Sequence, residues 1–200
     1  MTIATYTELV TELEAYLKRS DYTPRIPTFV SLTEARLNRL LDDPEMEVRA
    51  TATGTGQYTT LPSDFKRMVG VSTGNNYELQ QVSGSQISSM DQTNAGVPRK
   101  YAIADGSITF SPINSAAAIS MLYVRRLPPL TAAAPTNWLL TMAPDLYLYG
   151  CLLQAHLYGW YDERIPLFKA AYDEAIAEMK NDGDTRRWGS APLRPRLGRT

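Results

Sequence analysis

The stretch "GVPRKYAIADGSITFSP", residues 96–112, predicts a β-hairpin and so places β-structure in the middle of this 200-residue chain. Apolar residues stand at every second position before the Asp105-Gly106 pair, at Tyr101 and Ile103, and the alternation resumes after it. Asp-Gly adopts the positive φ angles that a two-residue hairpin turn requires. The stretch therefore indicates two antiparallel strands joined at Asp105-Gly106.

Similar patterns on both sides extend the β-structure. Residues 46–60 alternate apolar and polar side chains around "GTG", which predicts an earlier hairpin. Residues 66–82 predict two more strands around "GNN", and Ser83 with Gln86 predicts a short capped helix. The segment "AISMLYVRRL" predicts a last strand that ends against two prolines. We therefore expect an inserted antiparallel β domain.

Helical patterns precede this β domain. Thr5 and Glu8 form a capping-box pattern, and the apolar residues that follow recur on one helical face as far as about Ser20. A second helix is expected from about Thr28 to the residues before Pro44, because a proline restricts the residue before it. Two antiparallel helices are therefore predicted at the start of the chain.

Two further helices are expected after the β domain. One runs from Pro144, which suits a first helical turn, to Tyr158, and it is apolar on most sides. The other begins at Asp162 and ends at "NDGD", residues 181–184. The order predicts an α+β fold. Its parts are a helical domain made of residues 1–45 and 138–182, an inserted β domain at 46–137, and an extended C-terminal arm at 183–200.

Charge is unevenly distributed along the chain. Residues 1–184 hold 15 Lys and Arg against 21 Asp and Glu, whereas the last sixteen residues, "TRRWGSAPLRPRLGRT", hold five Arg and no acid. Binding to duplex DNA requires clustered cations that neutralise phosphates, so the acidic body is poorly suited to it. The basic end is suited to an acidic surface on another copy or on a different partner.

The C-terminal segment has the character of a docking arm. It shows no periodic apolar face, and Pro192 and Pro195 prevent a continuous helix. Arginine forms bidentate, charge-assisted bonds, and Arg and Trp are frequent at the energetic centres of interfaces. The alternative is a solvated terminus, against which the apolar Trp188 and Leu193 argue. The predicted contact residues, toward a partner or a neighbouring subunit, are Arg186, Arg187, Trp188, Leu193, Arg194, Arg196 and Arg199.

Composition argues against disulfide, zinc and membrane-spanning proteins. A single cysteine, Cys151, cannot form an internal disulfide, and a single histidine, His156, does not fit Cys/His zinc spacing. We therefore expect no cofactor and no metal. The N-terminal residues lack the pattern of a secretory signal, and polar residues interrupt the apolar stretch 138–161, so we expect a cytosolic chain without a membrane span.

The sequence offers little for catalysis. His156 and Cys151 are five residues apart on an expected helix and do not share a face, which disfavours a Cys-His dyad. The adjacent carboxylates Asp42-Asp43 and Asp162-Glu163 stand at expected helix boundaries, where capping accounts for them. The prediction is a protein that is not an enzyme.

Several segments, taken in order, resemble the head-to-tail adaptor proteins of tailed bacteriophages, which are also called connector or head completion proteins. The resemblance extends from the first expected helix to about Met179. The segments that carry it are "LPSDF" (61–65), "GVPRKYAIADGSITFSP" (96–112), "LYVRRLPPLTAAAPTNWLLTMAPDLYLYGCLLQA" (122–155) and "LYGWYDERIPLFKAAYDEAI" (157–176).

This resemblance implies a structural virion protein at the head-tail interface, assembled in the host cytoplasm. Such adaptors form a homo-oligomeric ring, typically dodecameric, beneath the portal protein, and the ring continues the DNA channel and offers its lower surface to a tail or nozzle protein. Helices form the ring wall, and the C-terminal segment commonly reaches up to the portal. Genomic DNA would pass through without sequence-specific binding.

Three alternatives remain open on the sequence. The first is a tail-nozzle ring in the same virion, and the second is a nucleic-acid-binding module that uses the Arg-rich tail. The third is a cell-wall hydrolase that uses the carboxylates of Asp42, Asp43, Asp162 or Glu163.

Overall fold

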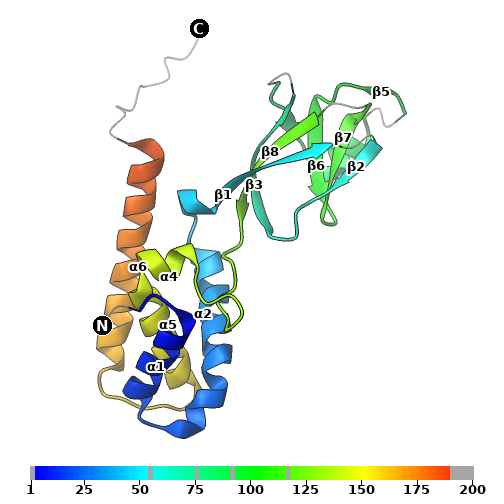
Figure 1. Cartoon of the computed structure of the whole chain (residues 1–200). Coiled ribbons are helices and arrows are strands. Elements are labelled where there is room, and N and C mark those ends of the chain that lie inside the picture. Colours follow the sequence, from blue (N-terminus) through cyan, green and yellow to red (C-terminus); the bar gives the residue numbers. More distant parts are fainter. Residues whose placement is uncertain (1–2, 54–55, 75–76, 91–92, 116–117, 190–200) are drawn as a thin grey trace. The chain divides into compact units, whose positions relative to one another are not determined.

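The computed structural model describes residues 3–53, 56–74, 77–90, 93–115 and 118–189, and it shows an α+β fold (Figure 1). The predicted fold class is therefore confirmed. The chain divides into two compact units, a helical one of residues 1–45 with 127–200 and a β-rich one of residues 46–126.

The helical unit contains the helices that the sequence predicts, together with short ones that it does not. Thr5 and Glu8 form both bonds of the predicted capping box at the start of the first helix. Pro144 lies in the first turn of the long apolar helix, and Gly159 ends that helix with a φ of 120°. The elements are α1 (Tyr6–Leu17), η1 (Ser20–Arg25), α2 (Ile26–Leu40), α4 (Trp138–Met142), α5 (Pro144–Tyr158) and α6 (Ile165–Trp188).

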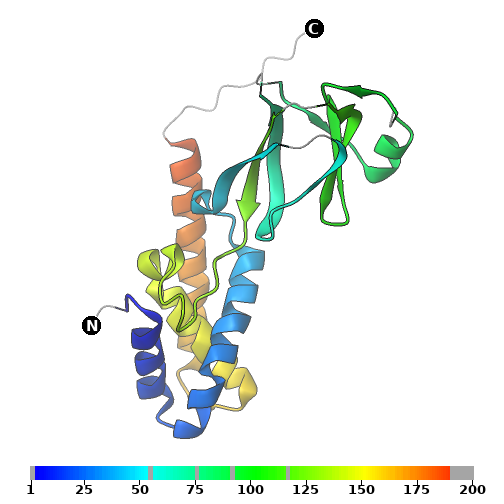
Figure 2. The ribbon, with the colours of Figure 1, turned by 45° about the vertical axis from the view of Figure 1, so that its right-hand side comes forward.

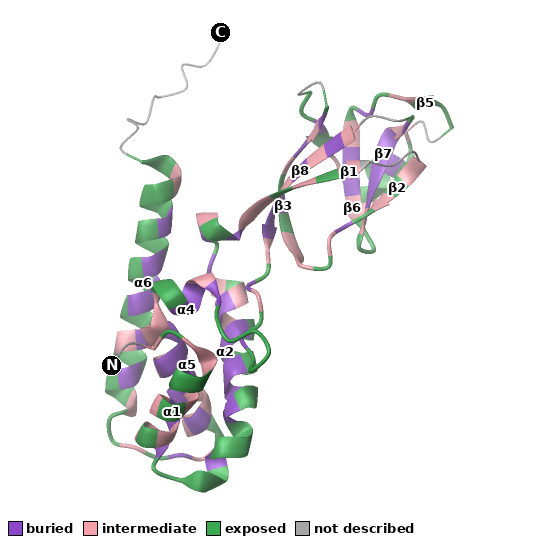
Figure 3. Ribbon diagram, in the orientation of Figure 1, coloured by how far each residue is buried: buried purple, intermediate pink, exposed green. Residues whose placement is uncertain are grey.

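Helix α5 is the centre of this unit. Most of its residues are buried, because α1, α2 and α6 all pack against it (Figures 1 and 2). At Gly150 a Cβ atom would collide with Thr33 of α2 and lie 3.1 Å from Cε2 of Tyr172 in α6. Glycine is therefore what lets α2 and α6 approach α5 closely at this level. Buried residues line the inner sides of α2 and α6 (Figure 3).

Helix α6 is longer than the sequence predicts. We expected it to end at residues 181–184 and the chain to be extended from residue 183, but the helix continues to Trp188. Asn, Asp and Gly are weak helix formers, which is why the local sequence indicates an end there. Tertiary contacts of Arg186 and Arg187, described below, hold the last turns in place.

The segment between the last strand and α4 packs with the helices. The sequence assigned residues 127–137 to the β domain, but they belong to the helical unit. The Leu127 N–H donates to Asn38 Oδ1 at 2.7 Å, and the Leu130 N–H donates to Glu34 Oε1 at 2.7 Å. Both acceptors lie on α2, so two backbone groups that the prolines leave outside any strand are satisfied by side chains of a helix.

The β-rich unit contains two sheets. A three-stranded antiparallel sheet has the order β1-β8-β3, and a second sheet has the path β2-β7-β6-β4 with β5 paired to β7. The two-residue strands β4 and β5 pair in parallel, so the second sheet is mixed where the prediction was wholly antiparallel. The elements are η2 (Pro44–Met46), which leads into the unit, β1 (Glu47–Thr53), β2 (Gly56–Thr60), β3 (Phe65–Thr73), β4 (Gln80–Gln81), α3 (Gly84–Ser88), β5 (Ala95–Gly96), β6 (Lys100–Ala104), β7 (Ser107–Asn114) and β8 (Ala118–Arg125).

The hairpin at Asp105-Gly106 is confirmed. Ala104 pairs with Ser107, and the turn residues have φ angles of 49° and 67°. The short helix capped by Ser83 and Gln86 is also confirmed as α3. Tyr101 lies opposite Phe110, and both are buried in one core with residues of the other sheet.

The hairpin predicted at residues 46–60 is wrong. β1 pairs with β8 and β2 pairs with β7, so the two strands belong to different sheets. Alternation predicts that a segment is a strand but does not determine its partner, and here both partners come from far along the chain.

Candidate partner-binding surface

The C-terminal end of α6 is held to the chain that leaves α2 by Arg186. Its Nη2 donates to Asp43 Oδ2 at 2.7 Å, and its Nε lies 2.9 Å from Asp182 Oδ2. Its Nη1 lies 3.7 Å from Glu45 Oε1. The Asp43 side chain is only 2% exposed, and its Oδ1 accepts from the Glu45 N–H. A buried carboxylate needs such partners, so the bond with Arg186 is structural.

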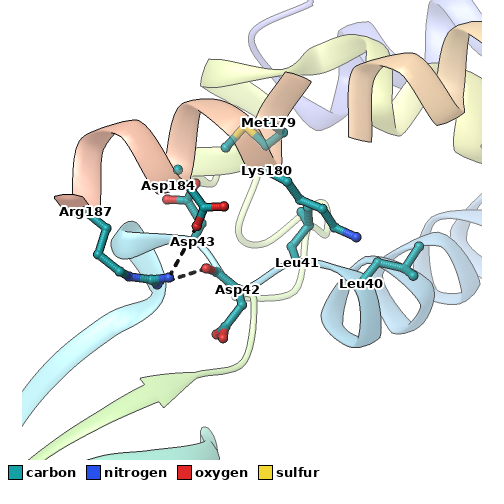
Figure 4. A pocket seen from close by; sticks show the side chains of 9 residues that line it. Leu40, Leu41, Asp42, Asp43, Met179, Lys180, Asp184 and Arg187 are labelled. Atoms are coloured by element: carbon teal, nitrogen blue, oxygen red, sulfur yellow. Dashed lines mark hydrogen bonds and ion pairs between the residues drawn. The ribbon is translucent and has the colours of Figure 1, made fainter. Parts of the chain in front are cut away.

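A small pocket lies beside this ion pair (Figure 4). Arg187 reaches across it, and its Nη2 donates to the backbone oxygen of Asp42 at 3.0 Å. The same guanidinium lies 3.9 Å from Asp184, one turn earlier on α6. At Gly183 a Cβ atom would stand 3.0 Å from Asp43 Oδ2, a tight contact, so glycine favours the close approach of α6 to this segment. The apolar wall of the pocket includes Leu40, Leu41 and Met179.

Trp188 is the last residue of α6, and it is 69% exposed. Leu193, Arg194, Arg196 and Arg199 lie outside the described residues. Of the seven predicted contact residues, Trp188 thus lies on the surface at the end of a rigid helix, where a partner can reach it. A large indole left in water at a helix end is suited to binding an apolar hollow on another molecule.

The extended conformation predicted for Arg186 and Arg187 is wrong, whereas their contact with a partner stays a prediction. Each was expected to contact a partner from an extended arm, but both are helical and engage acceptors of their own chain. The acceptors precede them by more than 140 residues, at Asp43 and Asp42. The sequence did indicate that Asp42-Asp43 stand at a helix end, but nothing in it indicates that the end of α6 lies beside them.

The carboxylates considered for catalysis have structural contacts and lie apart. Asp42 and Asp43 stand beside the end of α6, whereas Asp162 precedes its start, and the helix between spans about 30 Å. Asp162 accepts two hydrogen bonds from the Arg164 guanidinium and one from the Arg164 N–H. These bonds lower the pKa of Asp162 to about 2, so it is a poor proton donor. The two pairs cannot act on one bond.

Cys151 and His156 also have structural surroundings. Cys151 is fully buried, its Sγ lies 3.7 Å from the Thr33 hydroxyl, and burial raises the pKa of the thiol to about 12. Such a thiol is a poor nucleophile at neutral pH. His156 Nδ1 lies 2.9 Å from the backbone oxygen of Trp160, and this hydrogen bond stabilises the turn after α5.

The family model described as "SU10 adaptor protein" matches residues 4–196, nearly the whole chain. The chain belongs to the SU10 adaptor protein family. The resemblance to phage head-tail adaptors is thereby confirmed at the level of the family, and this SU10 adaptor is a structural phage protein and a component of the virion. A comparison with curated proteins gave no match.

Two further observations describe this SU10 adaptor. Within the described residues, no group of three or more His, Cys, Asp or Glu side chains is placed to hold a metal ion. None of the helices in those same residues is long and apolar enough to cross a bilayer.

Proposed function

We propose that this SU10 adaptor forms a ring between the portal and the tail of the virion, continues the DNA channel, and docks on the portal through its C-terminal segment. The observation that carries the proposal is the reach of the family match. It extends to residue 196, so the cationic segment that contains Arg194 and Arg196 belongs to what the family shares.

The described end of the chain supports docking from a rigid base. The ion pairs of Arg186 fix the last turns of α6, so Trp188 is presented at a defined place. Residues 190–200 follow with three arginines and no acid. Linking an apolar anchor to a cationic segment raises avidity, because the second contact forms at a high effective concentration.

The charge of the body supports passage of DNA. With Asp and Glu in excess over residues 1–184, the ring would repel phosphates more than it attracts them. DNA could then slide through without sticking.

Truncation after Gly189 tests the docking part of the proposal. Since the described ion pairs of Arg186 and Arg187 are retained, the truncated protein should keep its far-UV spectrum and melting temperature and lose binding to the portal ring. Wild-type portal binding by the truncated protein would contradict the proposal. Retention of the full chain by duplex DNA, with no binding to the portal, would favour the nucleic-acid-binding alternative.

Two variants separate the apolar from the ionic contribution of this segment to portal binding. Trp188→Ala should weaken portal binding about equally at low and high salt, whereas replacing Arg194, Arg196 and Arg199 with Gln should remove the salt-dependent part. Leu157→Ala is the matched control for the first variant, since Leu157 is 77% exposed but lies in the last turn of α5, next in sequence to the start of α6 and not to its end.

A further inference from the structure

Two outward-facing rows of residues on α2 and α6 have the same spacing. On α2 the row is Leu32, Ala35 and Arg39, and on α6 it is Leu167, Ala170 and Glu174. Each row follows an i, i+3, i+7 pattern, so each occupies one helical face over about 10 Å. All six residues are exposed, and the two leucines are 49% and 66% exposed.

The two faces carry opposite charges, and neither Arg39 nor Glu174 forms an ion pair within the described residues. In α2 the charged residues besides the buried Glu34 are Arg36 and Arg39. Arg36 stacks on the Tyr172 ring at 4.9 Å, and Arg39 forms no ion pair within the described residues. The α2 face therefore presents an unneutralised cation at its C-terminal end.

The facing part of α6 carries an excess of carboxylates. Asp173, Glu174 and Glu178 lie between two cations, Lys169 and Lys180, so carboxylates are in excess here. Neither Glu174 nor Glu178 has an ion pair in the part of the chain that the structure describes. Glu174 and Glu178 are four residues apart, and like charges at this spacing repel each other. A cation from outside the chain would relieve that repulsion.

The direction of the helices determines how the rows can meet. Helices α2 and α6 run in the same direction, and both pack against α5 (Figures 1 and 2). Their outer rows point away from α5, so they do not meet within one subunit. A rotation about an axis parallel to the helices would bring α2 of one copy beside α6 of the next, in a parallel orientation.

On the basis of the proposed ring, we infer that α2 of each subunit packs in parallel against α6 of the next copy of this chain. The pairs are Leu32 with Leu167, Ala35 with Ala170, and Arg39 with Glu174. The alanines let the helices approach to the 8–10 Å typical of packed helices, the leucines cover each other, and the ion pair fixes the register. Because two different faces meet, the contact is heterologous and repeats around a ring.

Cysteine pairing tests this interface. Full-length Ala35→Cys and Ala170→Cys proteins are mixed in equal amounts and oxidised, both free in solution and bound to portal rings. The mixture should give a mixed disulfide dimer, and the double variant should give a ladder of larger species. Each single variant alone should form no disulfide-linked dimer, because a heterologous contact never brings a position beside the same position of another copy. Cys151 is fully buried and leaves these products unchanged, which the wild-type protein checks.

Charge exchange tests the register. Arg39→Glu and Glu174→Arg should each lower the yield of the mixed disulfide about tenfold, the change produced by roughly 1.4 kcal/mol. The combination of both in all subunits should restore it. Arg19→Glu, at an exposed arginine paired with Asp21, is the matched control and should have no effect.

The outcomes separate the interface from the ring itself. Two results would overturn the interface and leave the proposed adaptor function intact. In the first, both variants bind the portal as rings but their mixture forms no mixed disulfide. In the second, either variant alone forms a disulfide-linked dimer. A mixed disulfide in a protein that never binds the portal would support the interface and overturn the proposed function. No disulfide and no portal binding would overturn both.

Discussion

At the scale of single residues, Glu34 holds the segment after β8 against the helices through hydrogen bonds. Its Oε1 accepts from the Leu130 N–H at 2.7 Å and from the Tyr147 hydroxyl at 3.0 Å, and Tyr147 accepts from Asn137 Nδ2 at 2.6 Å. Burial raises the pKa of Glu34, while the two hydrogen bonds partly offset that rise. These hydrogen bonds satisfy the buried polar atoms of Glu34, Asn137 and Tyr147. A buried charge is nevertheless costly, so a neutral side chain would be more favourable than the Glu34 carboxylate at this position.

Glu34→Gln should change how stability depends on pH. A carboxyl whose pKa is raised by folding binds protons more tightly in the folded state, so its contribution to stability falls as pH rises above about 4.3, the ordinary pKa of Glu, until pH passes the raised value. Gln has no such titration. The melting temperature of Glu34→Gln minus that of wild type should therefore be more positive at pH 7.5 than at pH 4.5.

Differential scanning calorimetry at both pH values measures this difference. Glu163→Gln, at an exposed carboxylate, is the control, and its difference from wild type should change less between the two pH values. A Glu34→Gln difference that falls as pH rises would contradict the assignment of burial as the dominant influence on Glu34.

At the scale of elements, the last turns of α6 depend on tertiary contacts. Asn181, Asp182 and Gly183 favour a helix end, and the sequence prediction failed here because the opposing influence, Asp43, is remote in the chain. The hairpin at Asp105-Gly106 could be predicted because all of its determinants are local. The partners of β1 and β2 could not be predicted, since pairing with β8 and β7 depends on the complete unit.

Arg186→Met should loosen the end of α6. The substitution removes the guanidinium from the buried Asp43 carboxylate, which keeps its hydrogen bond from the Glu45 N–H. A buried polar group that loses its partner destabilises the folded state by about 1–3 kcal/mol. Amide hydrogen exchange at residues 183–188 should accelerate, and the free energy of unfolding should fall by a similar amount.

Arg164→Met is the control for that variant. Arg164 and Asp162 also lie 2.7 Å apart, but Arg164 is 53% exposed and the two residues are close in sequence. Exchange at 183–188 should be unchanged in this control. Unchanged exchange in Arg186→Met as well would show that apolar packing alone holds the end of α6.

At the scale of the whole molecule, the chain is a helical unit interrupted by a β-rich one. The sequence order of helices, strands and helices indicated this arrangement, and the buried row of α1 could be predicted from helical periodicity. The candidate contact surface stays a prediction. Trp188 is exposed at the end of α6, and Arg186 and Arg187 bind their own chain. These intrachain bonds could not be predicted, because charge alone does not distinguish a cation that binds a partner from one that fixes a helix.

The pairing of β1 with β8 brings the two ends of the β-rich unit together, so a short linker could take the place of the unit. Glu47 pairs with Val124, so the chain enters and leaves this unit at neighbouring positions about 5 Å apart. Replacing residues 48–123 with a short Gly-Ser linker should leave a helical unit that unfolds cooperatively, because the contacts of Arg186 with Asp43 and of Leu130 with Glu34 lie outside the replaced residues. Circular dichroism during heating measures this, with the isolated β-rich unit, residues 46–126, as the counterpart. Loss of the cooperative transition in the shortened protein would show that the helices need the inserted unit to fold. A cooperative transition would show that the helical unit and the inserted strands are stabilised separately, so that either could change without the other.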